Sequence, residues 1–361
     1  MAAKLTDSDM EALVEDLKRR VSGEVRFDKM TRVLYSTDAS IYQIEPIGVV
    51  IPRNDQDVIA VIEEAYRYSL PLLPRGGGTS LAGQTVGNAI ILDFSKYMRD
   101  VVEINVEENW VRTQPGIVLD ELNAHLRPHG LLFAPDPSTS NRGNVGGALG
   151  NNSCGAHSIM WGKTVDNVID LDVVLSNGDQ ARYGALDGAG LDTVTNSNGL
   201  AAHIYRELIA IGEKSHEEVL ARYPKIQRRV SGYNLDELSS DGFNMAKFVV
   251  GSEGTLVTVT EAKLRTVAIP REKALAVLHF HTLLESMEAT VATLELEPAA
   301  VEMIGSMIIR QARYNLEYSR LMDFIQGDPE ALLVVELLGD STAEVESKLD
   351  RLERMTTRRG L

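Results

Sequence analysis

The spacing of hydrophobic residues in the first hundred positions predicts helices and strands in alternation. Residues 6–21 carry apolar side chains at helical spacing, and Thr6 with Asp9 three positions later has the form of a capping box. The further elements predicted here are strands at 48–51, 70–73 and 89–94 and a helix capped by Asn54. A glycine loop separates the last two strands, and this order is typical of an α/β nucleotide site.

The middle of the chain predicts more strands and one long stretch of turn formers. The predicted elements are short strands within 101–113, a helix at 117–126, strands at 171–175 and 248–260, and a charged helical region at 203–238. From Pro135 to Gly155 we expect a loop without a helix or strand of its own. A loop of this length inside a domain usually has a function.

The last ninety residues predict an α+β unit. The expected order is a strand at 274–281, a helix at 283–294, a strand at 299–303, a helix at 304–320, a strand at 332–338 and a helix at 342–355. A sheet covered by helices usually needs a strand after the last helix, so we expect an incomplete unit. The predicted division is a helical segment at 1–42, a main domain at 43–269 and a partial domain at 270–361.

Composition narrows the classes of function. The 361 residues hold 36 Lys plus Arg against 52 Asp plus Glu, a net charge of −16, which argues against a nucleic-acid partner. Cys154 is the only cysteine, so neither a disulfide nor an iron–sulfur cluster can form within the chain. No apolar run is long enough to cross a membrane. We expect a cytoplasmic protein, with peripheral attachment to the membrane through partners left open.

A glycine loop after the second predicted strand is the first candidate site. Three successive glycines allow backbone N–H groups to converge on an anion, and neighbouring hydroxyls add donors. Its candidate residues are Pro74, Arg75, Gly76, Gly77, Gly78, Thr79, Ser80, Gly83 and Gln84. This suits a diphosphate; the alternative is a flexible turn between strands.

Two further turn-rich segments complete the candidate site. Their prolines fix the backbone, their glycines permit close approach to a flat ligand, and their Asn and Ser side chains offer short donors and acceptors. The candidates are Pro135, Asp136, Pro137, Ser138, Thr139, Asn144, Val145, Gly146, Gly147, Asn151, Ser153, Gly155, Gly162 and Val168, followed by Glu253, Gly254 and Val257 in a tight turn expected between two strands.

Two common nucleotide motifs are absent. No Gly-x-Gly-x-x-Gly fingerprint of a Rossmann unit occurs, either in the glycine loop or at Gly188 and Gly190. Gly162-Lys163-Thr164 resembles the end of a P-loop, but His157 stands where that motif needs its first glycine.

With these three segments in this order, the chain resembles the FAD-binding (PCMH-type) domain of vanillyl-alcohol-oxidase flavoproteins. The resemblance is to the branch of FAD-linked D-2-hydroxyacid dehydrogenases such as D-lactate dehydrogenase and the glycolate oxidase flavin subunit, and it runs from about Ser36 to Thr266. It implies an α+β fold, a two-subdomain FAD-binding domain followed by an incomplete ferredoxin-like substrate or cap domain. The candidate residues above would then hold FAD, with Arg75 to Ser80 around its diphosphate.

The resemblance also implies how the cofactor and its partners behave. Some members tether FAD through a histidine where this chain has Thr79, so we expect non-covalent FAD. Segments 151–155 and 229–235 look like longer homologues fused to an iron–sulfur module, which implies an electron acceptor or iron–sulfur partner. A small 2-hydroxy acid is the implied substrate, and a homo-oligomer stays open.

The catalytic residues are the least defined part of this prediction. Relatives use a His-x-Gly-Asp-Gly-Asn-x-His type segment that this sequence lacks, and we predict no metal site, since His279 and His281 are a pair without a nearby carboxylate. Arg229, Tyr233 and His157 are the catalytic candidates. The expected activity is oxidation of a D-2-hydroxy acid such as D-lactate, glycolate or D-2-hydroxyglutarate. The alternatives are a flavin-binding fragment or subunit without turnover, an NADPH-dependent reductase of cell-wall precursor synthesis, and a non-flavin protein with ordinary turns.

Overall fold

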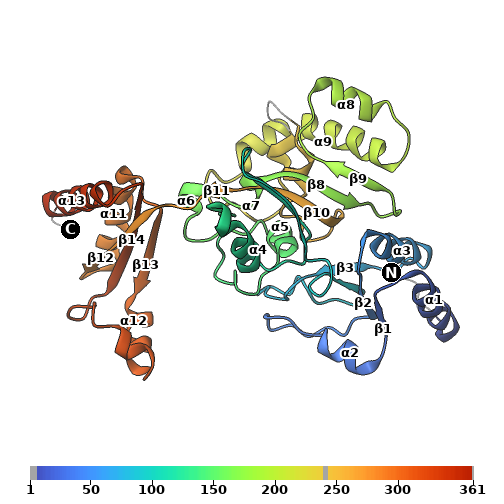
Figure 1. Cartoon of the computed structure of the whole chain (residues 1–361), viewed down its shortest axis with the longest axis horizontal. Helices are drawn as coiled ribbons and strands as arrows, with labels where there is room; N and C mark the ends of the chain where they lie inside the picture. The colour runs from blue at the N-terminus through green and yellow to red at the C-terminus, as the bar shows by residue number, and fades with distance from the viewer. Residues whose placement is uncertain (1–5, 239–242, 360–361) are drawn as a thin grey trace. The chain divides into compact units, whose positions relative to one another are not determined.

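The computed structural model describes residues 6–238 and 243–359, which form two units (Figure 1). The first unit contains the described residues up to Cys154 together with Lys163–Val267. The second contains Gly155–Gly162 and the residues from Ala268 onward. Helices and strands occur in both, which confirms the predicted mixed α+β class.

The first unit holds most of the elements. Its helices are α1 (Asp7–Arg20), α2 (Lys29–Leu34), α3 (Asp55–Arg67), α4 (Leu119–Leu126), α5 (Val145–Asn151), α7 (Thr164–Asn167), α8 (Gly188–Thr195), α9 (Leu200–Arg222) and α10 (Met245–Val249). Its strands are β1 (Glu24–Arg26), β2 (Gly48–Ile51), β3 (Leu72–Arg75), β4 (Ile90–Asp93), β5 (Val101–Asn105), β6 (Trp110–Thr113), β7 (Leu131–Leu132), β8 (Val168–Val174), β9 (Gln180–Tyr183) and β10 (Thr258–Arg265), and β11 (Val267–Ala268) joins the units.

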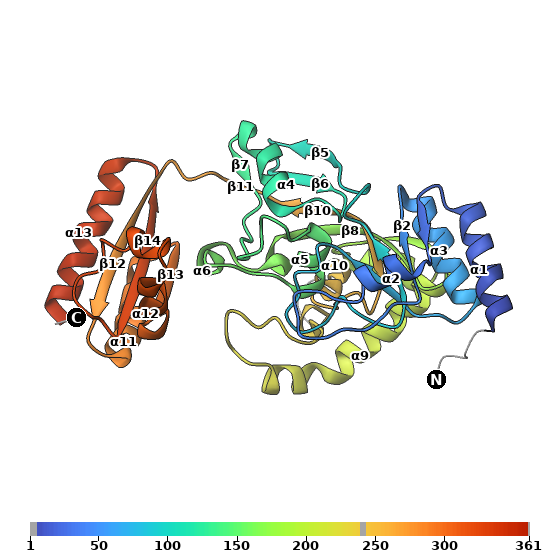
Figure 2. The ribbon, with the colours of Figure 1, turned by 90° about the horizontal axis from the view of Figure 1, so that it is seen from below.

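Two sheets organise the first unit. One has the order β1-β2-β4-β3, with β2, β4 and β3 parallel, and the other is antiparallel with the order β5-β6-β10-β8-β9. Helices α1 and α3 lie side by side (Figures 1 and 2), and Leu13, Leu17, Val58 and Val61 bury their side chains in the core between these helices and the first sheet. The predicted strand–helix–strand–loop–strand order is therefore confirmed, with the glycine loop between β3 and β4.

Capping residues explain where the first helices begin. The side chain of Thr6 accepts from the backbone N–H of Asp9 at 3.2 Å, and the carboxylate of Asp9 accepts in return from the backbone of Thr6 at 3.1 Å. Asn54 caps α3 in the same way, since its Oδ1 accepts from the backbone N–H of Asp57. Both predicted caps are confirmed.

The second unit is a three-stranded sheet with helices. Its elements are α6 (Ser158–Trp161), β12 (Glu272–Phe280), α11 (Leu283–Thr293), β13 (Ala300–Gly305), α12 (Ser306–Tyr314), β14 (Ala331–Gly339) and α13 (Thr342–Arg359). The strands are antiparallel in the order β12-β14-β13, and α11 and α13 pack on the sheet around Leu333, Val335 and Leu337 (Figure 2). This is the strand order of the first three strands of a ferredoxin-like βαββαβ unit.

Three local predictions are wrong. The stretch 135–155 contains helix α5, because Val145, Ala148 and Leu149 follow one another at helical spacing and are buried in the core. The strand predicted at 248–260 starts only at Thr258, since the residues before Val250 form helix α10. The helix predicted at 304–320 ends at Tyr314.

Candidate functional site

A cleft in the first unit is lined by the glycine-rich segments. Its larger hollow encloses about 760 Å³ of empty space, part of it open to solvent, and a second hollow of about 400 Å³ adjoins it. Gly76, Thr85, Gly147 and Asn151 line both hollows. The two hollows therefore form one elongated cleft between the β3–β4 loop, helix α5 and the turn after α10.

Most of the predicted cofactor residues line this cleft. They are Pro74, Arg75, Gly76, Gly77, Gly78, Thr79, Ser80, Gln84, Pro137, Thr139, Asn144, Gly146, Gly147, Asn151, Ser153, Glu253, Gly254 and Val257. Six others in the first unit are not among its lining residues: Gly83, Pro135, Asp136, Ser138, Val145 and Val168. Gly155 and Gly162 belong to the segment that groups with the second unit.

The glycine loop depends on the absence of side chains. A Cβ atom on Gly76 would lie 2.7 Å from Oδ1 of Asn144, and one on Gly77 would lie 2.3 Å from the carbonyl oxygen of Arg142. Gly78 has a φ of +64°, in the left-handed region. The loop can therefore lie against the start of α5 only with glycine at these positions.

The side chain of Arg75 holds the protein backbone. Its guanidinium donates to the carbonyl oxygens of Tyr35 (3.1 Å), Thr85 (2.9 Å) and Thr37 (2.7 Å), and it lies over the ring of Tyr35 at 5.2 Å. Burial lowers the pKa of Arg75. These contacts fasten the segment before β2 to the glycine loop, so this side chain shapes the cleft as well as contributing charge to it.

The start of helix α5 presents an unsatisfied acceptor. The side-chain N–H of Asn144 donates to the carbonyl of Gly116, whereas its Oδ1 is buried and has no hydrogen-bond partner. A buried polar atom without a partner is costly, and a bound water, ion or ligand that supplies the missing hydrogen bond would account for it. One turn further on, a Cβ at Gly147 would meet no atom within 4 Å, so the helix surface here faces empty space.

The opposite wall of the cleft is the turn after α10. Glu253 adopts a φ of +53°, and its backbone N–H donates to the carbonyl of Gly150 at 2.9 Å. Nε2 of Gln84 donates to Oε1 of Glu253 at 3.3 Å, and Gln84 also contacts the hydroxyl of Ser80. These contacts join the glycine loop, α5 and this turn, although the three segments are far apart in sequence.

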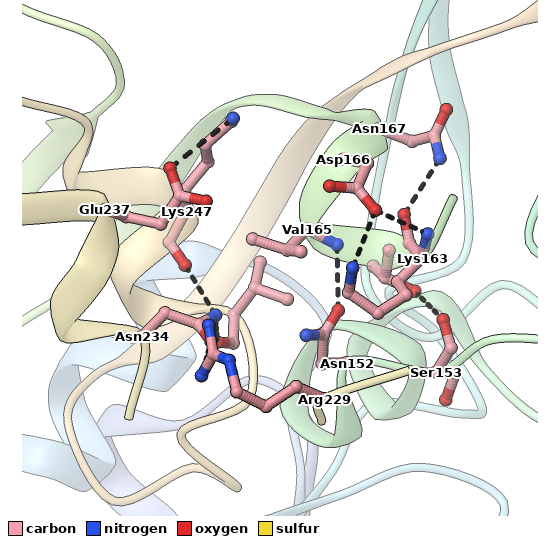
Figure 3. Close-up of polar contacts among 12 residues, drawn as sticks. Asn152, Ser153, Lys163, Val165, Asp166, Asn167, Arg229, Asn234, Glu237 and Lys247 are labelled. Atoms are coloured by element: carbon pink, nitrogen blue, oxygen red, sulfur yellow. Dashed lines mark hydrogen bonds and ion pairs between the residues drawn. The ribbon is translucent and has the colours of Figure 1, made fainter. Parts of the chain in front are cut away.

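Hydrogen bonds also fix the end of α5 (Figure 3). Oδ1 of Asn152 accepts from the backbone N–H of Val165 at 2.9 Å, and the carbonyl of Ser153 accepts from the hydroxyl of Thr164 at 2.8 Å. Asn152 adopts a left-handed φ of +50° as the helix ends. The cleft residue Ser153 is thus held by the segment that leads into β8.

Two catalytic candidates, Arg229 and Tyr233, lie in the first unit and outside the lining of the cleft. Arg229 forms an ion pair with Asp236 and lies over the ring of Tyr223 at 4.7 Å (Figure 3 shows its contact with Asn234). The hydroxyl of Tyr233 hydrogen-bonds with that of Thr255 at 2.9 Å.

The third candidate, His157, lies in the second unit beside α6. Its Nε2 is 3.2 Å from Oε1 of Glu336, and its ring stacks on Trp161 with 5.2 Å between centroids. Glu336 stands on the central strand β14 with its side chain only 15% exposed. A carboxylate in this setting needs a partner, and His157 supplies one.

Of the two closely spaced histidines, His279 lies in β12 and His281 directly follows that strand. Nε2 of His279 accepts from the backbone N–H of Gln326 at 3.2 Å. Among residues 6–238 and 243–359, no group of three His, Cys, Asp or Glu side chains is placed to hold a metal ion. In the same part of the chain, no helix has the length and hydrophobicity needed to span a membrane.

Further residues line the cleft that were not among the candidates predicted from sequence. They are Thr85, Phe94, Pro115, Leu119, Gly143, Ala148, Leu149, Gly150, Val249, Ser252 and Val259. Gly143 and Gly150 fall within the second motif and were accessible from the pattern. The apolar residues have no local signal, because they look like core residues until the tertiary structure exposes one side of them.

Known proteins match this chain over most of its length. The sequence profile described as FAD binding domain matches residues 46–184. The chain is 35% identical over 336 residues to D-2-hydroxyglutarate dehydrogenase of Pseudomonas putida, covering 91% of this chain and 33% of that protein. It is 33% identical over 341 residues to the protein of that name from Escherichia coli, and the match covers 92% of this chain and 34% of that protein. The glycolate oxidase subunit GlcD of Bacillus subtilis is 29% identical over 303 residues, which are 81% of this chain and 54% of that protein.

Solved structures share the fold. p-Cresol methylhydroxylase matches with a TM-score of 0.69 and 14% identity, over 99% of this chain and 65% of that one. Alkyldihydroxyacetonephosphate synthase matches with a TM-score of 0.68 and 17% identity, over 98% of this chain and 60% of that one. The chain spans about one third of the length of the D-2-hydroxyglutarate dehydrogenases that it matches.

The cleft itself fits FAD. Its glycine loop offers backbone N–H groups to a diphosphate, Oδ1 of Asn144 can accept from a cofactor hydroxyl or N–H, and the open surface at Gly147 leaves room for a flat group. The match to the FAD-binding profile agrees with this assignment. Residues 46–184 therefore match an FAD-binding domain, in a chain that is similar over most of its length to D-2-hydroxyglutarate dehydrogenases, to a glycolate oxidase subunit and to a D-lactate dehydrogenase.

Proposed function

We propose that this chain oxidises a D-2-hydroxy acid in an FAD-dependent reaction, with D-2-hydroxyglutarate as the first substrate to test. The observation that carries the proposal is the glycine-lined cleft with its unsatisfied Asn144 acceptor, in a chain that aligns over nine tenths of its length with D-2-hydroxyglutarate dehydrogenases. We propose residues 43–269 as the FAD-binding domain and residues 270–361 as part of the substrate domain.

The cleft residues would bind and orient the cofactor. Backbone N–H groups of the loop from Gly76 to Ser80 would donate hydrogen bonds to the diphosphate. Gln84 and Glu253, which contact each other, would form the wall of the larger hollow around the rest of the cofactor. Residue 79, where a histidine could have formed a covalent bond to the cofactor, is a threonine, so FAD would be held without a covalent bond. Bound FAD supplies the hydride acceptor of the reaction.

Oxidation of a 2-hydroxy acid to a 2-oxo acid also releases the hydroxyl proton. Among the candidates, His157 has a side chain suited to accepting a proton, and its ring contacts the carboxylate of Glu336. Arg229 would suit a substrate carboxylate, but its guanidinium is already paired with Asp236. Arg229, Tyr233 and His157 therefore all stay candidates for substrate binding and proton transfer.

The second candidate function is a flavin-binding subunit that does not turn over alone. It is supported by the positions of Arg229 and Tyr233, which lie outside the lining of the cleft that would hold FAD. In that case electrons or substrate would come from a partner, such as the iron–sulfur partner expected from the sequence. The proposed location is the cytoplasm, with peripheral attachment to a membrane through that partner.

Anaerobic reduction of the purified, FAD-loaded chain separates these functions. Bleaching of the flavin absorbance by D-2-hydroxyglutarate, D-lactate or glycolate, with no change on adding L-2-hydroxyglutarate, would support the dehydrogenase. Reduction by dithionite but by none of the three acids would support the subunit without turnover. Reduction by NADPH would favour the reductase alternative, and a protein that stays colourless after incubation with FAD would contradict the FAD assignment.

A further inference from the structure

Residues 36–44 form a closed turn between α2 and β2. Thr37 and Gln43 pair as an antiparallel bridge. The backbone N–H of Ile44 donates to the carbonyl of Ser36 at 2.9 Å, and Nε2 of Gln43 donates to the Ser36 hydroxyl at 3.2 Å. These contacts hold the two ends of the segment together, and we call it the strap. None of the residues 36–44 is among those that line the cleft.

The strap lies against the glycine loop at two points. The backbone N–H of Ala39 donates to the carbonyl of Gly78 at 3.0 Å. Further along both segments, the ring of Tyr42 lies so close to Gly83 that a Cβ placed on this glycine would be 2.6 Å from Cδ2 of the ring. Glycine at 83 therefore permits the close approach of the strap, which gives a structural reason for a motif residue that does not line the cleft.

Asp38 connects the strap to the cleft itself. Its Oδ1 accepts from the backbone N–H of Ser40 at 2.8 Å, and its Oδ2 accepts from the hydroxyl of Thr85 at 2.8 Å. Burial opposes ionisation of Asp38, but the hydrogen bonds from Ser40 and Thr85 outweigh it and lower the pKa of the carboxyl group. Thr85 lines both hollows, and its carbonyl accepts from the guanidinium of Arg75. Thr85 is thus held on its side chain by the strap and on its backbone by β3.

The loop that these contacts hold needs support from outside the cleft. Gly76, Gly77 and Gly78 are consecutive, and glycine has more backbone freedom than any other residue. If the loop were free, ordering its backbone N–H groups around a diphosphate would weaken binding, whereas a loop that is already ordered avoids this cost. The strap can supply that order without occupying the space of the cofactor.

We propose that Asp38 is a positioning residue for FAD, which holds the glycine loop in its binding conformation through Thr85 and the strap. A charged acceptor forms stronger hydrogen bonds than a neutral one, so loss of this carboxylate should loosen the loop. This role rests on the proposed placement of FAD in the cleft and does not depend on which acid is oxidised.

FAD affinity and amide hydrogen exchange of the full chain test this role. Asp38→Ala removes both accepted hydrogen bonds, so it should weaken FAD binding about tenfold and speed exchange at residues 76–80 of the FAD-free protein. Asp38→Asn should show a smaller loss of affinity, since its amide can accept from the backbone N–H of Ser40 and donate to the Thr85 hydroxyl. The asparagine variant also keeps the shape of the side chain, so it tests the same contact if Asp38→Ala does not fold.

Asp28→Ala is the matched control. The carboxylate of Asp28 also accepts from a backbone N–H and a threonine hydroxyl, both of Thr31, at 3.0 and 2.8 Å. These contacts cap α2, and Asp28 lies outside the lining of the cleft. Asp28→Ala should lower the free energy of unfolding in urea, but it should leave FAD affinity and exchange at residues 76–80 unchanged.

FAD binding by Asp38→Ala as tight as that of the unaltered chain would overturn the proposed role. Equal losses of affinity in Asp38→Ala and Asp28→Ala would overturn it as well, since the effect would then come from general stability. An unaltered chain that does not bind FAD would instead contradict the FAD assignment, and exchange at residues 76–80 would still show whether Asp38 holds the loop.

Discussion

Substitution of Gly147 should change the stability of the fold and the affinity for FAD in opposite directions. Gly147 is the third residue of α5, it lines both hollows of the cleft, and a Cβ placed on it meets no atom within 4 Å. Alanine therefore fits the protein without a clash. A side chain at this position can extend only into the space that we assign to the cofactor.

The expected size of each effect follows from these contacts. Replacing a helical glycine by alanine should stabilise the FAD-free protein by about 0.5–1 kcal/mol, because the unfolded chain loses conformational freedom and nothing is strained. Gly147→Leu places a branched side chain in the cleft and should weaken FAD binding at least about tenfold, or about 1.4 kcal/mol. Gly147→Ala should show a smaller loss of affinity of the same sign.

Urea unfolding of the FAD-free protein and titration with FAD, followed by flavin fluorescence, measure the two effects separately. Gly188→Ala is the matched control, since Gly188 is the first residue of α8, its added Cβ also meets nothing within 4 Å, and it does not line the cleft. The control should bind FAD as the unaltered chain does. Unchanged FAD affinity in Gly147→Leu would refute the placement of the cofactor, whereas a destabilised Gly147→Ala would refute the local geometry.

Two other predictions concern stability alone. Thr6→Ala should lower the free energy of unfolding by about 1 kcal/mol in urea denaturation, since it removes the capping box of α1, and Thr6→Ser should restore it; equal stability of all three proteins would contradict the cap. Burial of Asp55 raises the pKa of its carboxyl group, and the negative charge of Asp172 raises this pKa further. The charged form of Asp55 is therefore disfavoured in the folded state, and the stabilising contribution of this group is lost as pH rises through its folded pKa. Asp55→Asn should therefore raise the melting temperature at pH 7 but leave it unchanged near pH 3. A lower melting temperature of the variant at pH 7 would contradict this prediction and show that the favourable interaction of the Asp55 charge with the start of α3 outweighs the cost of its burial.

The features that sequence predicted well are those with a local cause. The caps at Thr6 and Asn54 depend on residues three positions apart, and the glycine loop depends on backbone freedom at consecutive positions. Each signal lies within one short stretch of sequence. The order of β2, α3, β3 and β4 was accessible for the same reason, because periodicity is a property of a single segment.

The features that sequence missed depend on distant contacts. Helix α5 contains three glycines in seven residues, which favours a turn on local propensity, but burial of Val145, Ala148 and Leu149 in the core outweighs that preference. The segment 155–162 lies within the FAD-binding motif in sequence, yet it groups with the second unit, where His157 contacts Glu336 from 179 positions away. No local pattern around His157 contains that information.

The glycines of the candidate site illustrate what only the structure can separate. In sequence, Gly76, Gly77 and Gly147 look alike, as members of clusters that could serve a ligand. In the structure, Gly76 and Gly77 are needed by the protein, since a Cβ on either would collide with Asn144 or Arg142 at under 3 Å. Gly147 faces no protein atom, so the fold itself does not require glycine there. Glycine at 147 therefore does not follow from the packing of the fold, and a cofactor bound in the cleft would account for it.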